Sequence, residues 1–216
     1  MEIWEHLIKR AISHIEQSML PPNSDDRIHW SWGGGTVLMS RFSHRTSKDI
    51  DIFLSDPQFL GYFSPRLNDG MDDIGQYEEQ AEYIKLIYPE GEIDFIVGSS
   101  LSLDPYVKKE VFGRMVFCES TVEILAKKIV YRHRDFKTRD FFDLATALYF
   151  GTESERNEIK VFLQPYSHTL IKQLRKTEDF PFLETLSAGK VILEKGIEIL
   201  EKTLMSFDPD HSEPVH

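Results

Sequence analysis

The sequence predicts an α+β fold in which a small mixed β-sheet with flanking helices is followed by a C-terminal helical bundle. Strand and helix patterns alternate up to about residue 118, whereas only helical patterns follow Ser120. We therefore expect an α/β domain at residues 1–118 and a helical domain at residues 119–206. The mostly polar residues 207–216 predict a disordered tail.

The α/β part begins with a helical pattern, since Ile3, Leu7, Ala11 and Ile15 recur every four residues between polar positions. Short apolar runs between turn-forming residues predict the strands. Strands are expected at residues 27–32, 49–54, 77–88, 92–97, 106–109 and 114–117, and short helices at residues 36–42 and 57–67.

The C-terminal part contains only helical patterns, at residues 121–134, 139–150, 154–163, 165–176 and 190–206. In the last of these, Leu193, Ile197, Leu200 and Leu204 recur at helical spacing and form one apolar face. That face is expected either to cover the core or to form an interface.

The composition is that of a globular protein with a buried core, because 41% of the 216 residues are hydrophobic. A net charge of −11 argues against a protein that coats nucleic acid non-specifically. The sequence has no run of eighteen apolar residues and no secretory signal, so we expect no membrane span and a cytoplasmic location. Cys118 is the single cysteine, and we interpret it as a core residue at the end of a strand.

Two aspartates on one predicted strand are the first chemical signal. Because side chains alternate along a strand, Asp49 and Asp51 project from the same face, roughly 6–7 Å apart. Two like charges raise each other's pKa unless a cation lies between them. Hard cations such as Mg²⁺ or Mn²⁺ prefer carboxylate oxygens, so the pair predicts a metal site.

A third acid, Asp94, lies between large apolar neighbours on the strand at residues 92–97. If the two strands are adjacent, Asp94 joins Asp49 and Asp51 around two metal ions, either as a ligand or as a base. Such an arrangement supports in-line displacement at phosphorus, with one metal activating the attacking oxygen and the other neutralising the leaving group.

The glycine turn before the predicted helix at residues 36–42 is suited to phosphate binding. Gly34 and Gly35 allow backbone amides to approach a phosphate, and the helix presents its positive N-terminus there. Thr36 adds a hydroxyl donor, and Arg45 and Ser47, just before the aspartates, are expected to contact the same phosphates.

These motifs resemble those of polymerase-beta-type nucleotidyltransferases. Residues 32–38 read Trp-Gly-Gly-Gly-Thr-Val-Leu, and residues 44–51 read His-Arg-Thr-Ser-Lys-Asp-Ile-Asp. Within that superfamily the sequence is similar to the AbiEii/AbiGii toxin family, also called MenA-like, with its Gly-Gly-Thr-x-Leu and Arg-x-Ser-x-Asp-Ile-Asp patterns. The resemblance implies a nucleotidyltransferase fold and covers residues 30–150.

The same family has a second signature, a Lys in a helix followed by Arg-Asp-x-x-Asp-Leu. Here Lys128 matches the family's Lys, and Asp140 and Asp143 match the acidic pair. The resemblance implies that Lys128 neutralises triphosphate charge and that one of the two acids orients Lys128 or helps to deprotonate the acceptor. At position 127 the family usually has an acid, whereas this chain has Lys127, which leaves the register open.

Basic residues cluster between the two halves of the second signature, with only Asp135 opposing them. We weigh a solvated helix end against a cradle for a triphosphate or an RNA end. His44 and His133 each lie next to a basic residue in the sequence. We interpret both as surface groups rather than metal ligands. The cluster comprises Lys127, Lys128, Arg132, His133, Arg134, Lys137 and Arg139.

The sequence therefore predicts an enzyme that binds Mg²⁺ or Mn²⁺ and a nucleoside triphosphate (NTP) and transfers a nucleotidyl group to an acceptor hydroxyl. The resemblance implies the toxin of a type IV-like toxin–antitoxin or phage-defence system, with RNA, in particular a tRNA 3′ end, as acceptor and a cognate antitoxin as partner. Two alternatives remain open: a small-molecule or protein acceptor, and a non-catalytic binding module of the same fold.

Overall fold

A computed structural model of the chain describes residues 3–68, 74–177, 180 and 183–207, which form two compact units. The sheet unit consists of the described residues within 1–37, 47–100 and 105–120. The helical unit consists of residues 38–46 and 101–104 together with the described residues from Thr121 onward. Apart from Phe207, the predicted tail lies outside the described residues.

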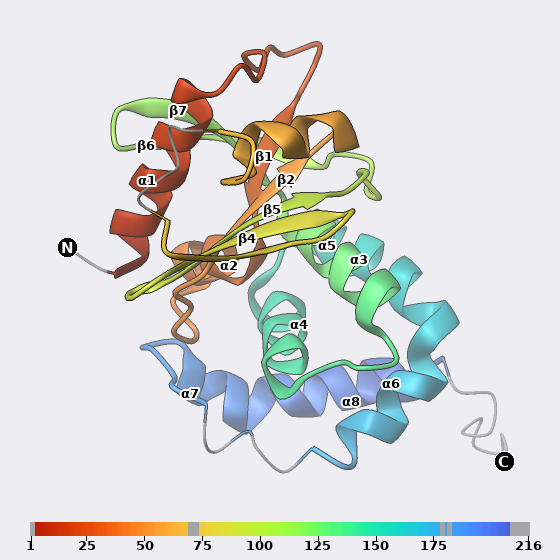
Figure 1. The fold of residues 1–216 in the computed structure, drawn as a ribbon. Coiled ribbons are helices and arrows are strands. Elements are labelled where there is room, and N and C mark those ends of the chain that lie inside the picture. The colour runs from red at the N-terminus through yellow and green to blue at the C-terminus, as the bar shows by residue number, and fades with distance from the viewer. Residues whose placement is uncertain (1–2, 69–73, 178–179, 181–182, 208–216) are drawn as a thin grey trace, which may run out of the picture. The chain divides into compact units, whose positions relative to one another are not determined.

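The sheet unit is built on a seven-stranded mixed sheet in the order β3-β4-β5-β2-β1-β7-β6. Strands β1, β2, β5 and β4 lie side by side in orange to yellow-green in Figure 1. The β2–β5 and β1–β7 pairs are parallel and the others antiparallel. The strands are β1 Trp30–Gly33, β2 Ile50–Leu54, β3 Gln76–Glu79, β4 Tyr83–Tyr88, β5 Gly91–Val97, β6 Tyr106–Val111 and β7 Arg114–Glu119. The predicted α+β class with a mixed sheet is confirmed.

One face of the sheet forms the core of this unit. Helix α1 (Ile3–Gln17) buries its apolar side there, and the indole of Trp4 stacks on that of Trp32 at 5.9 Å. On the same face, Phe63 stacks on Phe95 with ring centroids 3.9 Å apart. Burial alternates along β2, so residues 50, 52 and 54 face this core and residues 51 and 53 face the other side. Cys118 is fully buried, as expected.

Three sequence-based expectations differ from the structure. Residues 77–88 do not form one strand, because a turn at 80–82, closed by the Gln80 amide bonding to the Tyr83 carbonyl, separates β3 from β4. The helix expected to end near Leu67 is a 3₁₀ helix, η1 (Pro57–Phe63), whose N-terminus is capped by Asp56. Strand β2 starts at Ile50, so Asp49 lies just before it.

The helical unit contains the C-terminal part of α2 (Gly34–Phe42) and the elements from α3 onward, which run from green to blue in Figure 1. Its core includes Phe141, Phe142 and Leu170, and Leu200 and Leu204 of the predicted apolar face are fully buried in it. No helix within the described ranges is long and apolar enough to cross a membrane. Its elements are α3 Thr121–Arg132, α4 Thr138–Phe150, α5 Glu153–Leu163, η3 Gln164–Tyr166, α6 Ser167–Leu174, α7 Gly189–Val191, the π-helical η5 Ile192–Gly196 and α8 Ile197–Met205.

Candidate active site

A row of polar residues crosses the sheet on the face opposite α1. Asp51 of β2 pairs with Gly33 of β1 on one side and with Asp94 of β5 on the other. Asp94 in turn pairs with Lys85 of β4. Paired residues on neighbouring strands project from the same face, so the structure brings the carboxylates of Asp51 and Asp94 together.

The absence of a side chain at Gly34 leaves space for the carboxylate of Asp51. A Cβ at this position would lie 1.8 Å from Asp51 Oδ2, and the backbone φ of +74° is one that favours glycine. Gly34 and Gly35 are partly exposed and form the start of helix α2, which begins two residues earlier than the expected helix at residues 36–42. The glycine turn therefore presents the start of a helix beside the Asp51 carboxylate.

Asp94 carries a charge that its surroundings do not fully offset. Burial and the neighbouring Asp51 raise the pKa of Asp94 to about 7, although Lys85 opposes this shift. The Lys85 ammonium is 3.8 Å from Asp94 Oδ1, an atom that accepts no hydrogen bond from the described residues. Lys85 is also shared with Glu92, to which it donates a hydrogen bond. A cation would relieve the repulsion between the two aspartates.

Asp49 is held beside this pair by its backbone and its carboxylate. The fully buried Thr36 hydroxyl lies 2.5 Å from the Asp49 carbonyl oxygen and 3.2 Å from Ser47 Oγ. Asp49 Oδ1 accepts a hydrogen bond from the Glu92 amide at 3.3 Å. In this structure Thr36 thus orders the segment that enters β2.

The Asp51–Asp94 pair fits a divalent cation, because two carboxylates share one face and one buried oxygen lacks a hydrogen-bond donor. Among the described residues, however, no group of three or more His, Cys, Asp or Glu side chains is arranged as a metal site. The two aspartates are therefore the part of the predicted ligand set that the geometry supports, and a ligand role for Asp49 stays a prediction.

Glu119, at the end of β7, belongs to the same row and was not singled out from the sequence. Trp32 pairs with Cys118, which brings Gly33 and Glu119 side by side. A Cβ at Gly33 would lie 2.3 Å from Glu119 Oε2, and the glutamate is 1% exposed. The sequence offers one signal for Glu119: like Asp51 and Asp94, it is an acid on a mostly apolar strand. Whether such an acid lies near Asp51 depends on the order of the strands in the sheet.

In the helical unit, a buried charge network joins the two sequence signatures. Arg45 binds both carboxylate oxygens of Asp143, with Nε–Oδ1 and Nη2–Oδ2 distances of 2.7 and 2.8 Å. Lys128 Nζ donates to the same carboxylate at 2.7 Å, and His44 Nε2 lies 2.7 Å from it. Burial by itself raises the pKa of Asp143, but Arg45, Lys128 and the hydrogen bonds hold this pKa well below its usual range.

Asp140 completes the network. It accepts a hydrogen bond from Lys128 Nζ at 2.6 Å and another from the Lys137 amide at 3.1 Å. Burial raises the pKa of Asp140, whereas Lys128 lowers it and prevails. Both predicted acids therefore bind Lys128 directly. Lys127 instead pairs with Glu123, which identifies Lys128 as the lysine of this network.

The two histidines differ from each other. The prediction of a surface group is wrong for His44, which is fully buried, bound to Asp143 and stacked on Phe142 at 5.8 Å. Its basic sequence neighbour, Arg45, is also buried against Asp143. His133 is half-buried and stacks on Tyr166 at 4.3 Å.

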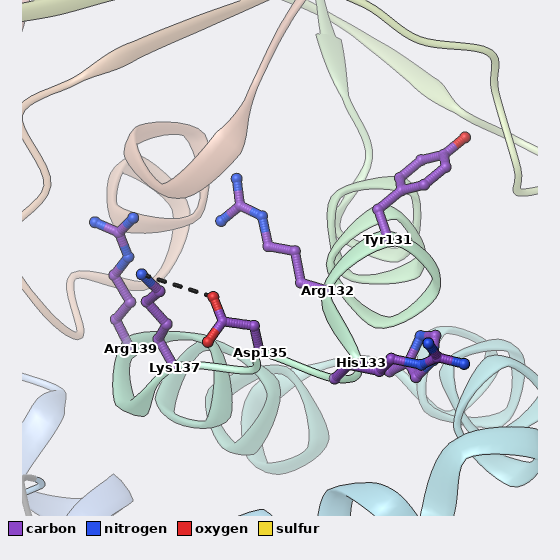
Figure 2. Close-up of a pocket in the computed structure, with 7 residues that line it drawn as sticks. Tyr131, Arg132, His133, Asp135, Lys137 and Arg139 are labelled. Atoms are coloured by element: carbon purple, nitrogen blue, oxygen red, sulfur yellow. Dashed lines mark ion pairs between the residues drawn. The ribbon is translucent and has the colours of Figure 1, made fainter.

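The outer members of the basic cluster line a pocket of about 380 Å³ at the α3–α4 connection (Figure 2). Arg132, Arg134, Lys137 and Arg139 are exposed, whereas Lys127 and Lys128 are buried. The cluster is thus divided into an inner pair, engaged by carboxylates, and an outer set that faces solvent.

Comparison with known proteins adds a family and a fold. The sequence profile of the nucleotidyl transferase AbiEii toxin family of type IV toxin–antitoxin systems matches residues 21–210. No protein of curated function matches the sequence.

Several solved structures resemble the chain, and two of them, both from Helicobacter pylori, share its fold. JHP933 from Helicobacter pylori is 11% identical, with a TM-score of 0.52 and coverage of 96% of this chain and 91% of its own. A second structure from H. pylori is 12% identical, with a TM-score of 0.52 and coverage of 98% of this chain and 96% of its own. MenT4, a nucleotidyltransferase toxin from Mycobacterium tuberculosis, is 14% identical over 95% of this chain and 85% of its own, at a TM-score of 0.49.

Proposed function

We propose a specific reaction for this chain, which belongs to the AbiEii nucleotidyltransferase toxin family and is therefore a nucleotidyltransferase of the toxin type. The enzyme uses Mg²⁺ or Mn²⁺, takes a nucleotidyl group from an NTP and transfers it to an RNA hydroxyl, in particular at a tRNA 3′ end. It acts in the cytoplasm, and a cognate antitoxin controls it. The α/β domain carries the chemistry, and the helical domain supports it.

The observation that carries this proposal is the juxtaposition of Asp51 and Asp94 beside the glycine turn. Two aspartates on neighbouring strands, with a pKa near 7 for one of them, leave negative charge that a divalent cation would offset. Asp51 and Asp94, with Asp49 next to them, would hold the ion, which would supply electrostatic stabilisation of the phosphate charge. Gly34, Gly35 and the N-terminus of α2 bind the phosphates.

In the reaction, the acceptor oxygen forms a bond to the α-phosphorus as the bond from that phosphorus to the bridging oxygen of pyrophosphate breaks. The acceptor hydroxyl loses its proton in this step. Asp94 accepts that proton if the Asp94 carboxylate is not a ligand of the metal ion. The family pattern assigns triphosphate binding to three further residues, Arg45, Ser47 and Lys128. Asp140 and Asp143 hold the Lys128 ammonium at its position, as the 2.6 and 2.7 Å contacts support.

The experiment incubates the purified full chain with Mg²⁺, each NTP labelled on its α-phosphate in turn, and total cellular RNA. The matched variant is Asp51→Asn, which removes one charge and keeps the side-chain shape. We expect label in RNA with the wild-type chain and at least a hundredfold less with the variant. Label in protein or in a small molecule would move the acceptor to that class. No label in any fraction would overturn the enzymatic assignment.

A further inference from the structure

The outer basic residues form a pocket that the transfer chemistry described above does not use. The lining runs from the end of α3 to the first turn of α4, and Figure 2 shows Arg132, Lys137 and Arg139 extending to one side of the connection. The seven lining residues are Tyr131, Arg132, His133, Arg134, Asp135, Lys137 and Arg139.

Positive charge dominates this pocket although the chain has a net charge of −11. Among its lining residues, Asp135 is the only acid, with an 88% exposed side chain 3.9 Å from Lys137 Nζ. Asp135 offsets one of the four positive charges of Arg132, Arg134, Lys137 and Arg139, so the lining stays positive. Asp140 lies 3.9 Å from Arg132, but its carboxylate also accepts the shorter hydrogen bond from Lys128. The pocket therefore attracts an anion locally.

The connection that carries these cations is fixed by side-chain hydrogen bonds. Gln173 of α6 accepts from the Phe136 amide at 3.0 Å and donates to the His133 carbonyl at 2.6 Å. The His133 ring stacks on Tyr166, and Phe136 packs into the core with 6% exposure. The backbone that carries the exposed cations is thus held in place by these contacts, which lowers the entropic cost of binding a ligand there.

Tyr131 distinguishes the type of anion. Its side chain lines the pocket among the cations, yet it is 62% exposed. Inorganic triphosphate needs cations and hydrogen-bond donors but no aromatic surface, and a nucleoside triphosphate offers a single base beside its phosphates. Single-stranded RNA offers both phosphates for the cations and unstacked bases for an aromatic ring. An exposed tyrosine in the same lining as four cations therefore favours RNA over inorganic triphosphate.

We propose that this pocket binds a single-stranded segment of RNA, with Tyr131 stacking on a base and Arg132, Arg134, Lys137 and Arg139 contacting the backbone phosphates. The inference rests on the proposed function in that the bound RNA is the acceptor of the nucleotidyl group. It adds the site on the helical unit where this acceptor docks and the part of the RNA that is recognised there.

The test is fluorescence polarisation of a labelled single-stranded RNA of about ten nucleotides with the full chain over a range of salt concentrations. Tyr131→Ala should weaken binding at least fivefold without changing the salt dependence, whereas Tyr131→Phe should bind as the wild type does. Arg134→Ala/Lys137→Ala should weaken binding roughly tenfold and reduce the slope of log Kd against log salt by about 1.4.

Two controls separate specific from general effects. Lys190→Ala/Lys195→Ala removes two exposed cations from the same unit, outside the pocket, and should leave binding unchanged. An RNA duplex should respond to Arg134→Ala/Lys137→Ala but not to Tyr131→Ala, because its bases are already stacked. If Tyr131→Ala binds single-stranded RNA like the wild type while inorganic tripolyphosphate displaces that RNA, the pocket is a triphosphate site and the inference is overturned.

Failure of this inference is distinguishable from failure of the proposed function. Asp51→Asn should bind the RNA as tightly as the wild type does. RNA labelling that is unaffected in Tyr131→Ala and Arg134→Ala/Lys137→Ala would overturn the docking site and leave nucleotidyl transfer intact. Conversely, if the variants change RNA binding as expected while the wild-type chain labels no acceptor, that result would support the docking site and overturn the proposed function.

Discussion

Arg45 and Asp143 lie 98 positions apart in the sequence and form a buried ion pair with two parallel hydrogen bonds, of 2.7 and 2.8 Å. Arg45 begins the Arg-x-Ser-x-Asp-Ile-Asp signature that contains Asp49 and Asp51, and Asp143 is the second acid of the Arg-Asp-x-x-Asp-Leu signature in α4. The two signatures that identify the family in the sequence are thus connected inside the helical unit. Because Lys128 and His44 share the same carboxylate, Asp143 is the centre of that network.

Replacing Asp143 should therefore reduce stability sharply. In Asp143→Asn, Arg45 and Lys128 lose the charge that compensates their burial, so the free energy of unfolding should fall by about 3–5 kcal/mol in urea denaturation. The exposed Asp135→Asn is the matched control and should change it by less than about 0.5 kcal/mol. An Asp143→Asn chain as stable as the control would show that the network does not hold the unit together.

Gly34→Ala tests whether the glycine turn makes room for Asp51. A methyl group would collide with the Asp51 carboxylate and would force alanine into a backbone conformation with φ +74°. We expect the rate of nucleotidyl transfer to fall at least a hundredfold, while circular dichroism still reports a folded chain. Gly61→Ala, where an added Cβ meets nothing within 4 Å, should keep the wild-type rate. A fully active Gly34→Ala chain would contradict the placement of Asp51.

Stability in the absence of metal should depend on pH through Asp94. Its pKa rises from 3.8 to about 7 on folding, so the native state holds a proton that the unfolded state has lost between these values. Stability therefore decreases as pH rises from about 4 to 7, by at most about 4 kcal/mol from this group. Urea denaturation of the wild type and of Asp94→Asn, whose side chain cannot ionise, should isolate the contribution of Asp94 to the pH dependence of stability. If the free energies of unfolding of the two proteins change in parallel with pH, Asp94 makes no such contribution.

Added Mg²⁺ should stabilise the wild type more at pH 8 than at pH 5, because protons compete with the cation for Asp94. Thermal unfolding at the two pH values measures this difference, and in Asp94→Asn it should largely disappear. The exposed Asp104→Asn serves as the control and should respond to Mg²⁺ as the wild type does. A Mg²⁺ shift of equal size at both pH values would point to an ion bound elsewhere.

Lys85 should set the pH at which the enzyme becomes active. Its ammonium, 3.8 Å from Asp94, opposes the rise of the Asp94 pKa. In Lys85→Met the acidic limb of the kcat/KM profile should move to higher pH, because Asp94 ionises later. Lys85→Arg keeps the charge and should leave the limb nearly in place. A shift towards lower pH in Lys85→Met would contradict the proposed coupling.

The sequence was informative wherever a local pattern decides the structure. Alternation along β2 and β5 correctly placed Asp51 and Asp94 on strand faces, and the glycine run correctly indicated a following helix, although α2 starts at Gly34 and not at residue 36. The error at residues 77–88 is also local: the hairpin turn at 80–82 has no glycine or proline, so nothing in the pattern marks it.

Long-range pairing could not be predicted in the same way. That β1 lies between β2 and β7 is decided by the packing of the whole sheet, and the β1–β7 pairing puts Glu119 beside Gly33. The burial of His44 has the same origin, since its partner Asp143 lies 99 residues away. A histidine next to an arginine looks like a surface group until the buried acid that neutralises them is known.

The most direct test of the central claim compares two labels on the same NTP. The wild-type chain is incubated with Mg²⁺, RNA and an NTP labelled either on its α-phosphate or on its γ-phosphate. Nucleotidyl transfer predicts that the α label enters RNA while the γ label is released in pyrophosphate, in equal amounts, and that Asp51→Asn does neither. Entry of the γ label into the acceptor would instead identify phosphoryl transfer and contradict the account.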